Sequence, residues 1–339
     1  MIYSFKDDYS EGCLPEILTV LSDGNLEQRR PYGHDRHSER ARQLIRRKLN
    51  QDQNEIFFVG SGTMANLLMI AATIKPFEAA ISVSGGHIAA HETGAIERAG
   101  HKVLEIPSHS GKLSPIDLRQ CVAAHQEAPH MVRPRLVYIS NATETGRVYL
   151  KEELSALYQT CQELDLLLML DGARLGAAMM SEKSDLSWPD LGHLTDMFWI
   201  GGTKNGAFGA EAIVFNKSDL AEDFEFHIKQ RGAMMSKSRF LGQQFTALFT
   251  DDRFDKSAQH ARSAARKMAA AIVAAGYELA QPCETNQIFP ILPDDLIQDL
   301  AKDFAFHNYG RVSETHAMIR LVTSWATPDH VVKAFCERF

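Results

Sequence analysis

Lys204 has the most unusual setting of any reactive side chain in this sequence. It lies within Gly201–Gly206 (GGTKNG), directly after the short apolar run Met197–Ile200, which is typical of a strand. Glycines at a strand end let the backbone approach a bound group closely. A lysine in this position is poorly placed as a solvated surface charge. A buried amine has a lowered pKa and is a good nucleophile toward a carbonyl carbon.

A carboxylate and a guanidinium follow a second apolar run, Leu166–Leu170. Asp171 ends this run, and Arg174 comes three positions later. Because an unpaired charge at the end of a buried strand is costly, Asp171 must meet a cation. One interpretation is an internal pair between Asp171 and Arg174. The other is that Asp171 contacts the protonated ring nitrogen of a cofactor, which leaves Arg174 for an anionic group.

Three further turns could hold parts of a ligand. Gly60–Thr63 (GSGT) lies between a strand and a helix, where free N–H groups and the helix dipole suit a phosphate, although a helix cap at Thr63 is the simple alternative. His87 follows Gly85 and Gly86, so its ring could lie on a flat ligand or be a structural residue. Arg320 lies in the apolar run Met318–Val322 and could bind a carboxylate or form an edge salt bridge.

The elements that must position these residues alternate along the chain. Short apolar runs predict strands, and amphipathic segments between them predict helices. The expected strands are Glu55–Val59, Ala79–Ser84, Lys102–Ile106, Arg135–Ser140, Leu166–Leu170, Met197–Ile200 and Glu211–Phe215. The expected helices are Pro15–Ser22, Ser38–Leu49, Met64–Ile74, His91–Ala99, Ser114–His125 and Lys151–Leu164. This pattern predicts an α/β fold with a mostly parallel seven-stranded sheet covered by helices, and right-handed crossovers would bring the glycine-rich turns to one edge.

The chain divides into three expected parts. Residues 1–35 lack a regular period and carry turn residues, which indicates an N-terminal arm that wraps another surface. Residues 36–250 form the large α/β domain. Residues 251–339 begin with a long helix over Asp255–Ala275 and continue as a small C-terminal α+β domain.

Composition excludes several other classes of protein. The chain has 339 residues and a net charge of −7, with no basic stripe, so a nucleic-acid partner is not expected. The polar N-terminus is unlike a signal peptide, and no apolar stretch is long enough for a membrane span. Five scattered cysteines without a CxxC pair signal neither a disulfide framework nor a metal site. We expect a cytoplasmic protein without a bound metal.

A phosphate turn, a flat ring, an aspartate, a lysine and an arginine, each at a strand end in this order, are the groups that a pyridoxal 5′-phosphate (PLP) site requires. The motifs that carry them resemble those of the threonine aldolases, in particular the low-specificity L-threonine aldolase branch of the β-eliminating lyase group, which are fold type I PLP enzymes. The resemblance extends over nearly the whole chain. It rests on Phe5–Gly12, Tyr32–Asp35, Ser61–Asn66, His87–Gly94, Thr143–Gly146, Asp171–Leu175, Gly201–Gly206 and Arg320–Trp325.

The resemblance implies a role for each site residue. Lys204 would bind PLP covalently, Asp171 would pair with its ring nitrogen, and His87 would stack on the ring near the substrate hydroxyl. The expected cofactor contacts otherwise come from Ser61, Gly62, Thr63 and Thr203. Arg174 and Arg320 would bind the substrate carboxylate, with Asp7 and Tyr32 also near the substrate. A basic residue of a neighbouring subunit would reach the phosphate, and the candidates are Lys229, Arg231 and Lys237. A homodimer or homotetramer with active sites at the subunit interface follows.

The sequence departs from the better-known branch at two places. Asp7-Asp8 replaces a Ser-Asp pair, and Glu144 stands where that branch has a histidine. The implied reaction is retro-aldol cleavage of L-threonine or L-allo-threonine to glycine and an aldehyde, with His87 or Glu144 as the base for the β-hydroxyl group. Another PLP reaction, such as β-elimination, racemisation or transamination, is the nearest alternative. A nucleotide-binding regulatory protein is the alternative from a different class.

Overall fold

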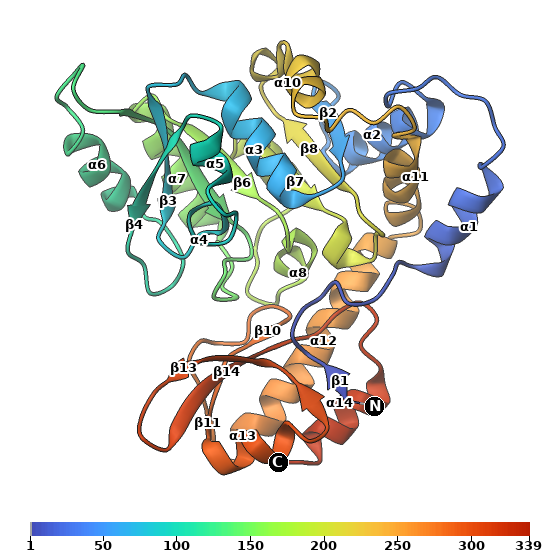
Figure 1. The fold of residues 1–339 in the computed structure, drawn as a ribbon, viewed down its shortest axis with the longest axis vertical. Helices are drawn as coiled ribbons and strands as arrows, with labels where there is room; N and C mark the ends of the chain where they lie inside the picture. Colours follow the sequence, from blue (N-terminus) through green and yellow to red (C-terminus); the bar gives the residue numbers. More distant parts are fainter. Residues whose placement is uncertain (1) are drawn as a thin grey trace.

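The computed structural model describes residues 2–339, and a seven-stranded sheet forms its centre (Figure 1). The strand order is β2-β8-β7-β6-β5-β3-β4. The neighbours from β7 to β4 are parallel, whereas β8 runs antiparallel to both β7 and β2. The strands are β2 (Glu55–Val59), β3 (Glu78–Val83), β4 (Lys102–Ile106), β5 (Arg133–Ser140), β6 (Leu167–Asp171), β7 (Met197–Gly201) and β8 (Glu211–Phe215). The mostly parallel seven-stranded sheet expected from the sequence is confirmed.

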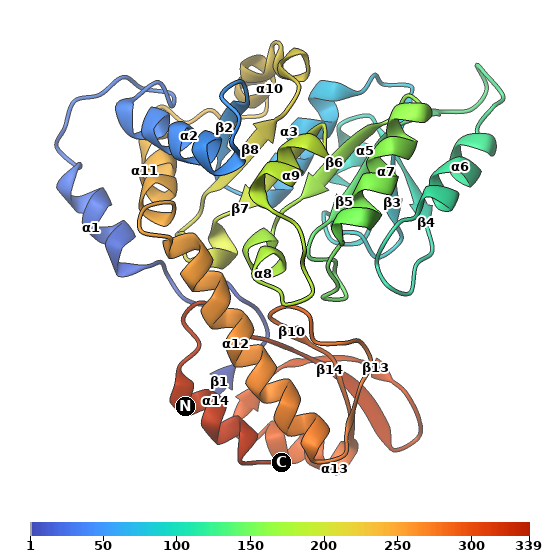
Figure 2. The same cartoon turned by 180° about the vertical axis from the view of Figure 1, so that it is seen from behind.

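Helices cover both faces of this sheet because its central strands are apolar on both sides (Figures 1 and 2). One core contains Ile45, Leu157 and Leu241, and the core on the opposite face contains Leu68, Ile96 and Phe224. The helices of the first face include α2 (Arg36–Leu49), α7 (Lys151–Glu163), α9 (Trp188–His193) and α11 (Arg239–Leu248). Those of the second face include α3 (Gly62–Thr73), α5 (Ala95–Arg98) and α10 (Phe224–Gln230). The chain also forms α6 (Pro115–Ala123) and α8 (Leu175–Met179).

A separate antiparallel sheet lies below the large sheet in Figure 1, and the long helix α12 (Arg253–Ala274) leads to it. Its strands are β9 (Glu278–Leu279), β10 (Gln287–Ile288), β11 (Pro290–Pro293), β13 (His307–Arg311) and β14 (His316–Val322). Helices α13 (Asp294–Leu300) and α14 (Asp329–Cys336) complete this unit. Met268, Leu321 and Phe335 belong to its core, which is distinct from the two cores of the large sheet.

The N-terminal segment contacts both the small C-terminal unit and the large α/β unit. β1 (Tyr3–Ser4) pairs in parallel with β12 (Phe304–Ala305), and Phe5 is buried in the core of the C-terminal unit. The chain then returns toward the large sheet, where α1 (Pro15–Asp23) packs against α11. The structure thus places Tyr3–Phe5 of the expected 1–35 arm in the small unit, and the segment between β1 and α1 crosses from one unit to the other (Figure 1).

The expected helix His91–Ala99 is wrong in its boundaries. The structure has two short helices instead, α4 (His87–Ala90) and α5 (Ala95–Arg98). Thr93 and Gly94 between them have positive φ values of 54° and 71°, which interrupt a right-handed helix. The break turns the side chain of Glu92 into the interior, where it contacts His87.

Candidate active site

A cavity of about 280 Å³ lies at the edge of the sheet where the glycine-rich turns meet. Most of the residues that line it follow the ends of β2, β3, β6 and β7. They are Tyr9, Gly60, Ser61, Gly62, Thr63, Asn66, His87, Asp171, Ala173, Trp199, Thr203, Lys204 and Glu211. The structure therefore brings together the predicted phosphate turn, the histidine, the aspartate and the lysine, which are up to 144 positions apart in the printed sequence, from Gly60 to Lys204. Within residues 2–339, no group of three metal-ligating side chains is present.

Asp171 ends β6 and is held in place by three hydrogen bonds. Its Oδ2 atom accepts from Tyr138 Oη at 2.5 Å and from Asn66 Nδ2 at 3.0 Å, and its Oδ1 atom accepts from Ala173 N at 2.9 Å. The side chain is buried, and burial together with the charge of Asp171 raises the pKa of Tyr138 well above its usual value. The internal pair between Asp171 and Arg174 is not formed, so this alternative is wrong.

His87 is oriented by a buried carboxylate. Its Nδ1 atom lies 2.9 Å from Oε1 of Glu92, whose side chain is fully enclosed. This hydrogen bond is the largest cause that raises the pKa of His87. Asn66 donates to Glu92 at 2.8 Å and accepts from Trp199 Nε1 at 2.9 Å, so it connects Glu92 with Asp171. With Nδ1 engaged, the Nε2 atom of His87 is the ring nitrogen left for a ligand in the cavity.

Lys204 follows β7 in a 3₁₀ turn formed by Thr203–Asn205. Burial lowers the pKa of its amine, and the positive charge of Arg174 acts in the same direction. Its Nζ atom lies 5.8 Å from the ring centroid of Tyr9. A Cβ atom at Gly201 or Gly202 would lie 2.5 Å from Ala173 O or 2.4 Å from Ala210 O. These two glycines are therefore required for backbone packing beneath Lys204, and their expected close approach to a ligand stays a prediction.

The turn between β2 and α3 leaves backbone donors at the cavity. Ser61 is the N-cap of α3, since its Oγ atom accepts from Met64 N at 3.3 Å. The cap is therefore Ser61, not Thr63. The N–H groups of Gly62 and Thr63 are in the first turn and have no helical partner. A Cβ at Gly62 would lie 2.6 Å from the Trp199 ring, which restricts this position to glycine.

Arg174 points to the N-terminal segment. Its Nε and Nη2 atoms donate to Asp8 at 2.8 and 3.0 Å, which is a buried bidentate pair. Burial is the largest single effect and favours the neutral form of Asp8. The charges of Arg174 and Lys204 and the hydrogen bonds from Arg174 and Asn286 together outweigh it, so the pKa of the carboxyl group is lowered. Asn286, from the small unit, also donates to Asp8 at 2.8 Å. Asp7, in contrast, caps a surface turn at Tyr9 N. Asp8 and Arg174 line a smaller pocket that Lys204 also lines, so Asp8 is the acid of this pair that lies next to the lysine.

The remaining predicted site residues lie away from the cavity lining. Arg320 donates to Lys6 O at 3.2 Å and stacks on Tyr309. Lys229 lies 5.2 Å above the ring of Tyr32. Arg231 contacts His227, and Lys237, which lies between α10 and α11, is exposed. Tyr32, Lys229, Arg231 and Lys237 therefore do not line the cavity that contains Lys204 in the same protomer.

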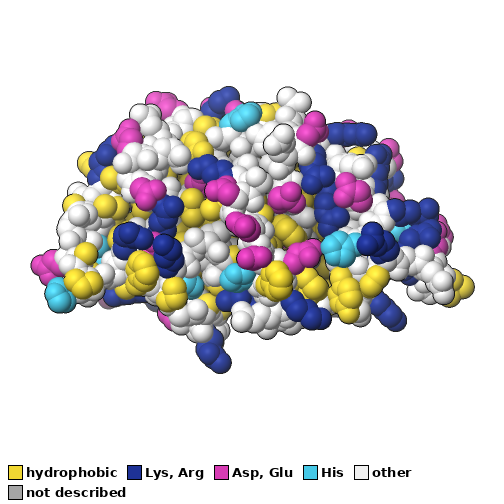
Figure 3. Space-filling view, turned by 90° about the horizontal axis from the view of Figure 1, so that it is seen from above, with side chains coloured by type: hydrophobic (Ala, Val, Ile, Leu, Met, Phe, Trp, Pro, Cys, Tyr) yellow, Lys and Arg dark blue, Asp and Glu magenta, His cyan; other side chains and the backbone are white. Residues whose placement is uncertain are grey.

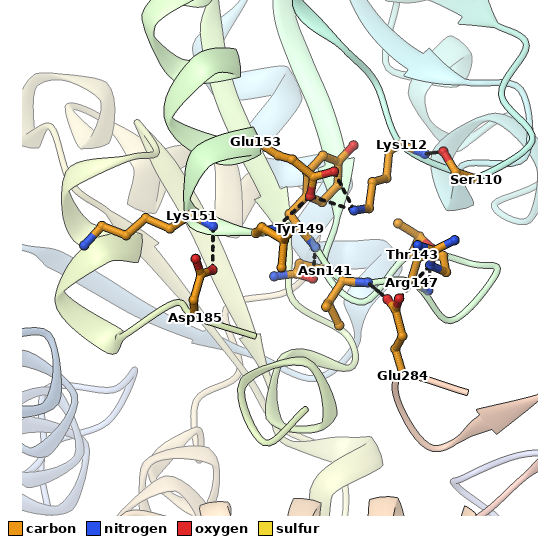
Figure 4. Close-up of polar contacts among 12 residues, drawn as sticks. Ser110, Lys112, Asn141, Thr143, Arg147, Tyr149, Lys151, Glu153, Asp185 and Glu284 are labelled. Atoms are coloured by element: carbon orange, nitrogen blue, oxygen red, sulfur yellow. Dashed lines mark hydrogen bonds and ion pairs between the residues drawn. The ribbon is translucent and has the colours of Figure 1, made fainter. Parts of the chain in front are cut away.

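Glu144 lies in the loop between Thr143 and Arg147, two residues that are labelled in Figure 4. This loop is fixed from two sides. Thr145 Oγ1 donates to Ser110 O at 2.7 Å, and Arg147 Nε lies 2.9 Å from Oε1 of Glu284, which lies between β9 and β10 of the small unit. Glu144 is half-buried and outside the cavity lining, but its negative charge acts on His87, Arg174 and Lys204. The loop therefore holds a carboxylate beside the site.

Several residues of the site were not singled out from the sequence. They are Tyr138, Trp199 and Glu211, whereas Asp8, Asn66 and Glu92 were named only as parts of the motifs Phe5–Gly12, Ser61–Asn66 and His87–Gly94. The signal for Glu92 is its position five residues after His87, and that for Glu211 is a charged residue at the start of an apolar strand. Tyr138 and Trp199 lie inside apolar strands and carry no such signal.

The fold and the arrangement of Lys204, Asp171 and the α3 turn define the chain as a fold type I enzyme. Solved structures of low identity support this class, and they include an aspartate aminotransferase of Thermus thermophilus (TM-score 0.73, 15% identity, covering 100% of this chain and 91% of that one). The family model described as beta-eliminating lyase matches residues 23–294. The chain belongs to the beta-eliminating lyase family.

Relatives of higher sequence identity show which branch of this family the chain resembles. The low specificity L-threonine aldolase of Pseudomonas aeruginosa is 36% identical over 330 residues, covering 95% of this chain and 93% of the relative. That of Pseudomonas sp. strain NCIMB 10558 is 34% identical over 336 residues, covering 97% and 94%. The structure of a Leishmania major threonine aldolase superimposes with a TM-score of 0.97 at 40% identity, covering 99% and 98%. The resemblance inferred from the motifs is confirmed, and the protein is a lyase of the threonine aldolase type.

Proposed function

We propose that this protein uses PLP to cleave L-threonine, L-allo-threonine and related β-hydroxy-α-amino acids into glycine and an aldehyde. The observation that carries this proposal is the placement of Lys204 and Asp171 in one cavity with the donor turn of α3. The similarity to low-specificity L-threonine aldolases supports the choice of substrate.

The groups that line the cavity fit PLP. Asp171 makes three hydrogen bonds, and a carboxylate has room for a further one from a protonated ring nitrogen. The first-turn N–H groups of Gly62 and Thr63 offer donors and a helix dipole to a phosphate. Thr203 donates to Glu211 at 2.5 Å, so its hydroxyl group already has a side-chain partner. Its expected contact with the cofactor stays a prediction.

PLP supplies an electron sink conjugated to the bond that breaks. Lys204 contributes an amine whose lowered pKa favours the neutral, nucleophilic form, so it would hold the cofactor covalently. Asp171 would keep a proton on the ring nitrogen, and its fixed position means that little reorganisation is needed. His87 would cover the ring with its Nε2 atom toward the substrate.

Two side chains could accept the proton of the substrate's β-hydroxyl group. His87 lines the cavity and has its Nδ1 atom bonded to Glu92, which makes Nε2 the basic atom. Glu144 is further out and would act through water. Geometry favours His87 as the base, with Glu144 as a nearby negative charge that favours the protonated imidazole.

The substrate carboxylate would be bound by arginine. Arg174 uses Nε and Nη2 for Asp8, which leaves its Nη1 atom as the donor for a carboxylate. Arg320 lies on β14 beside the N-terminal segment, and we propose that it supplies the second contact. Because Asp8 is fixed by Asn286 as well, the position of Arg174 depends on the small unit.

We also propose a homodimer or homotetramer. Tyr32, Lys229, Arg231 and Lys237 do not reach the cavity of their own protomer, which agrees with a role at the site of a neighbour. Large hydrophobic side chains are exposed, including Leu26 at 94%, Phe226 at 73% and Phe208 at 68%. In the view from above, hydrophobic side chains gather along one edge of the molecule, as an association surface requires (Figure 3).

The function is tested by incubating the PLP-loaded protein with L-threonine and L-allo-threonine and measuring glycine and acetaldehyde. Release of both in equal amounts is the expected result. Formation of 2-oxobutyrate instead would establish elimination and overturn the proposal. Failure of the purified protein to develop a Schiff-base absorbance with PLP would overturn the cofactor assignment itself.

A further inference from the structure

Glu211 is a buried carboxyl group in the cavity that the reaction above does not use. It is the first residue of β8 and is 4% exposed. It pairs in register with Val59 on one side and with Gly201 on the other. Val59 directly precedes the Gly60–Thr63 turn, and Gly201 directly precedes the turn that carries Lys204. Glu211 thus lies between the expected phosphate contacts and the lysine.

Both oxygens of Glu211 contact the residues just before Lys204. Oε2 accepts from Gly202 N at 2.9 Å, and Oε1 lies 2.5 Å from Thr203 Oγ1. Thr203 Oγ1 in turn accepts from Ala210 N at 3.3 Å. These contacts connect the start of β8 with the 3₁₀ turn, so the direction of the Lys204 side chain depends on the Glu211 side chain.

The charge state of Glu211 is unusual for a carboxyl group. Among the residues that the structure describes, no lysine, arginine or histidine forms a salt bridge with it, and the charged side chain that acts on its pKa is Lys204, which lines the same cavity. Burial raises the pKa of Glu211 from 4.5 to about 7, although hydrogen bonds from Thr203 and Gly202 and the charge of Lys204 act against this. A small change in its surroundings therefore decides whether the group is charged near neutral pH.

We propose that Glu211 is a positioning residue that fixes the Gly202–Lys204 turn, and that, at a pH where it is ionised, it takes up a proton when the cofactor's phosphate enters the cavity. The proposal rests on PLP binding as described above. A phosphate near Gly62 and Thr63 brings negative charge to the cavity that Glu211 also lines, and a nearby like charge favours the neutral carboxyl form. The proton comes from solvent, and no covalent bond changes. The neutral group still bonds to Thr203, with either oxygen as the donor.

The proton uptake is tested by titrating the cofactor-free protein with PLP at pH 6 and pH 8.5 and following tryptophan fluorescence, since Trp199 lines the cavity. By linkage, each pKa unit by which the phosphate raises Glu211 weakens wild-type affinity about tenfold at the higher pH. In Glu211→Gln this part of the pH dependence should vanish. The titrations of PLP itself are common to both proteins and cancel in the comparison.

Pyridoxal without phosphate and a matched variant complete this test. Wild-type and Glu211→Gln protein should show the same pH dependence for pyridoxal. Glu78→Gln removes another buried glutamate at the first residue of a strand of the same sheet, where it pairs with Arg133, and should behave as wild type with PLP. If Glu211→Gln keeps the wild-type pH dependence for PLP, the proton uptake is wrong, although the proposed function is not affected.

The positioning role has its own measurement, which is the rate of covalent attachment to Lys204 trapped by borohydride. Thr203→Val removes the hydroxyl group that contacts Glu211 and should slow attachment by roughly fivefold, as expected for the loss of one hydrogen bond. Thr203→Ser should restore the wild-type rate. Equal rates in Thr203→Val, Glu211→Ala and the wild type would overturn the positioning role, whereas failure of the wild type to attach PLP would instead overturn the proposed function.

Discussion

Replacing Glu211 with glutamine should change how the stability of the cofactor-free protein depends on pH. In the folded protein burial raises the pKa of Glu211 from 4.5 to about 7, whereas the unfolded chain has the usual value. Between these two pH values the folded state binds a proton that the unfolded state has released. The free energy of unfolding therefore falls as the pH rises through this window and is constant above it.

The size of this effect follows from the two pKa values. At about 1.36 kcal/mol for each pKa unit, the interval from 4.5 to about 7 corresponds to about 3 kcal/mol. Glutamine keeps the shape and the acceptor oxygen but cannot titrate. The free energy of unfolding of the wild type relative to Glu211→Gln should therefore decrease by about 3 kcal/mol between pH 4.5 and pH 8.

The assay is urea unfolding of both cofactor-free proteins at half-unit pH steps, with the slope of free energy against denaturant checked at each pH. Only the difference between the two proteins matters, since all other titrating groups are shared. Parallel curves for the two proteins from pH 4.5 to pH 8 would refute a raised pKa at Glu211. A difference that grows as the pH rises would mean that Glu211 is stabilised as a carboxylate.

Three other predictions concern the rest of the site. Lys204→Ala should keep its fold by circular dichroism but lose borohydride-trapped PLP and all turnover; retained turnover would exclude Lys204 as the covalent residue. Asp8→Ala leaves the buried guanidinium of Arg174 without its partner and should lower the free energy of unfolding by about 3–5 kcal/mol in urea, whereas a loss below 1 kcal/mol would mean that the pair is not formed. Glu92→Gln removes the largest cause of the raised pKa of His87, so the acidic limb of the activity–pH profile should move to lower pH, and an unmoved limb would exclude His87 as the base.

The large sheet could be predicted from the sequence because its strands are short apolar runs with clear ends. The run Leu166–Leu170 corresponds to β6, and Asp171, as the first charge after it, marks the functional end of that strand. In a mostly parallel sheet the C-terminal strand ends share one edge, so Asp171 and Lys204 had to be neighbours in space. The hydrophobic pattern and the topology of a parallel sheet were therefore sufficient to predict the large sheet and the proximity of Asp171 and Lys204.

The partners of these residues could not be predicted in the same way. Tyr138 lies in the middle of an apolar strand, and the hydroxyl group that donates to Asp171 does not change the apolar pattern of β5. Asn66 lies on the buried side of α3 and contacts Glu92, Asp171 and Trp199 at once. Such contacts depend on the distance between a helix and three strands, which local sequence does not encode.

The pairing of Arg174 illustrates why nearby charges mislead. Asp171 is three residues away, yet Arg174 binds Asp8, which is 166 positions away. Asp171 has three donors that are already fixed by β5, β6 and α3, so a guanidinium would add little to it. Asp8 is fixed by Asn286 alone besides Arg174, and a buried carboxylate with so few donors needs a cation.

The Asp8–Arg174 pair makes the site depend on the relative position of both sheets. Asn286 and Glu284 lie between β9 and β10 of the small unit, where Asn286 donates to Asp8 and Glu284 contacts Arg147 in the Glu144 loop. One short segment of the small unit therefore supports both the arginine proposed to bind the substrate carboxylate and the loop that carries a carboxylate near His87. A shift of this segment would move both Arg174 and the Glu144 loop, which are proposed to lie on two sides of the substrate. Glu284 is outside the cavity, but it contacts Arg147 in the Glu144 loop. Substitution at Glu284 should therefore change the Michaelis constant for threonine. The affinity for the cofactor should stay constant, because the residues proposed to bind it belong to the large sheet.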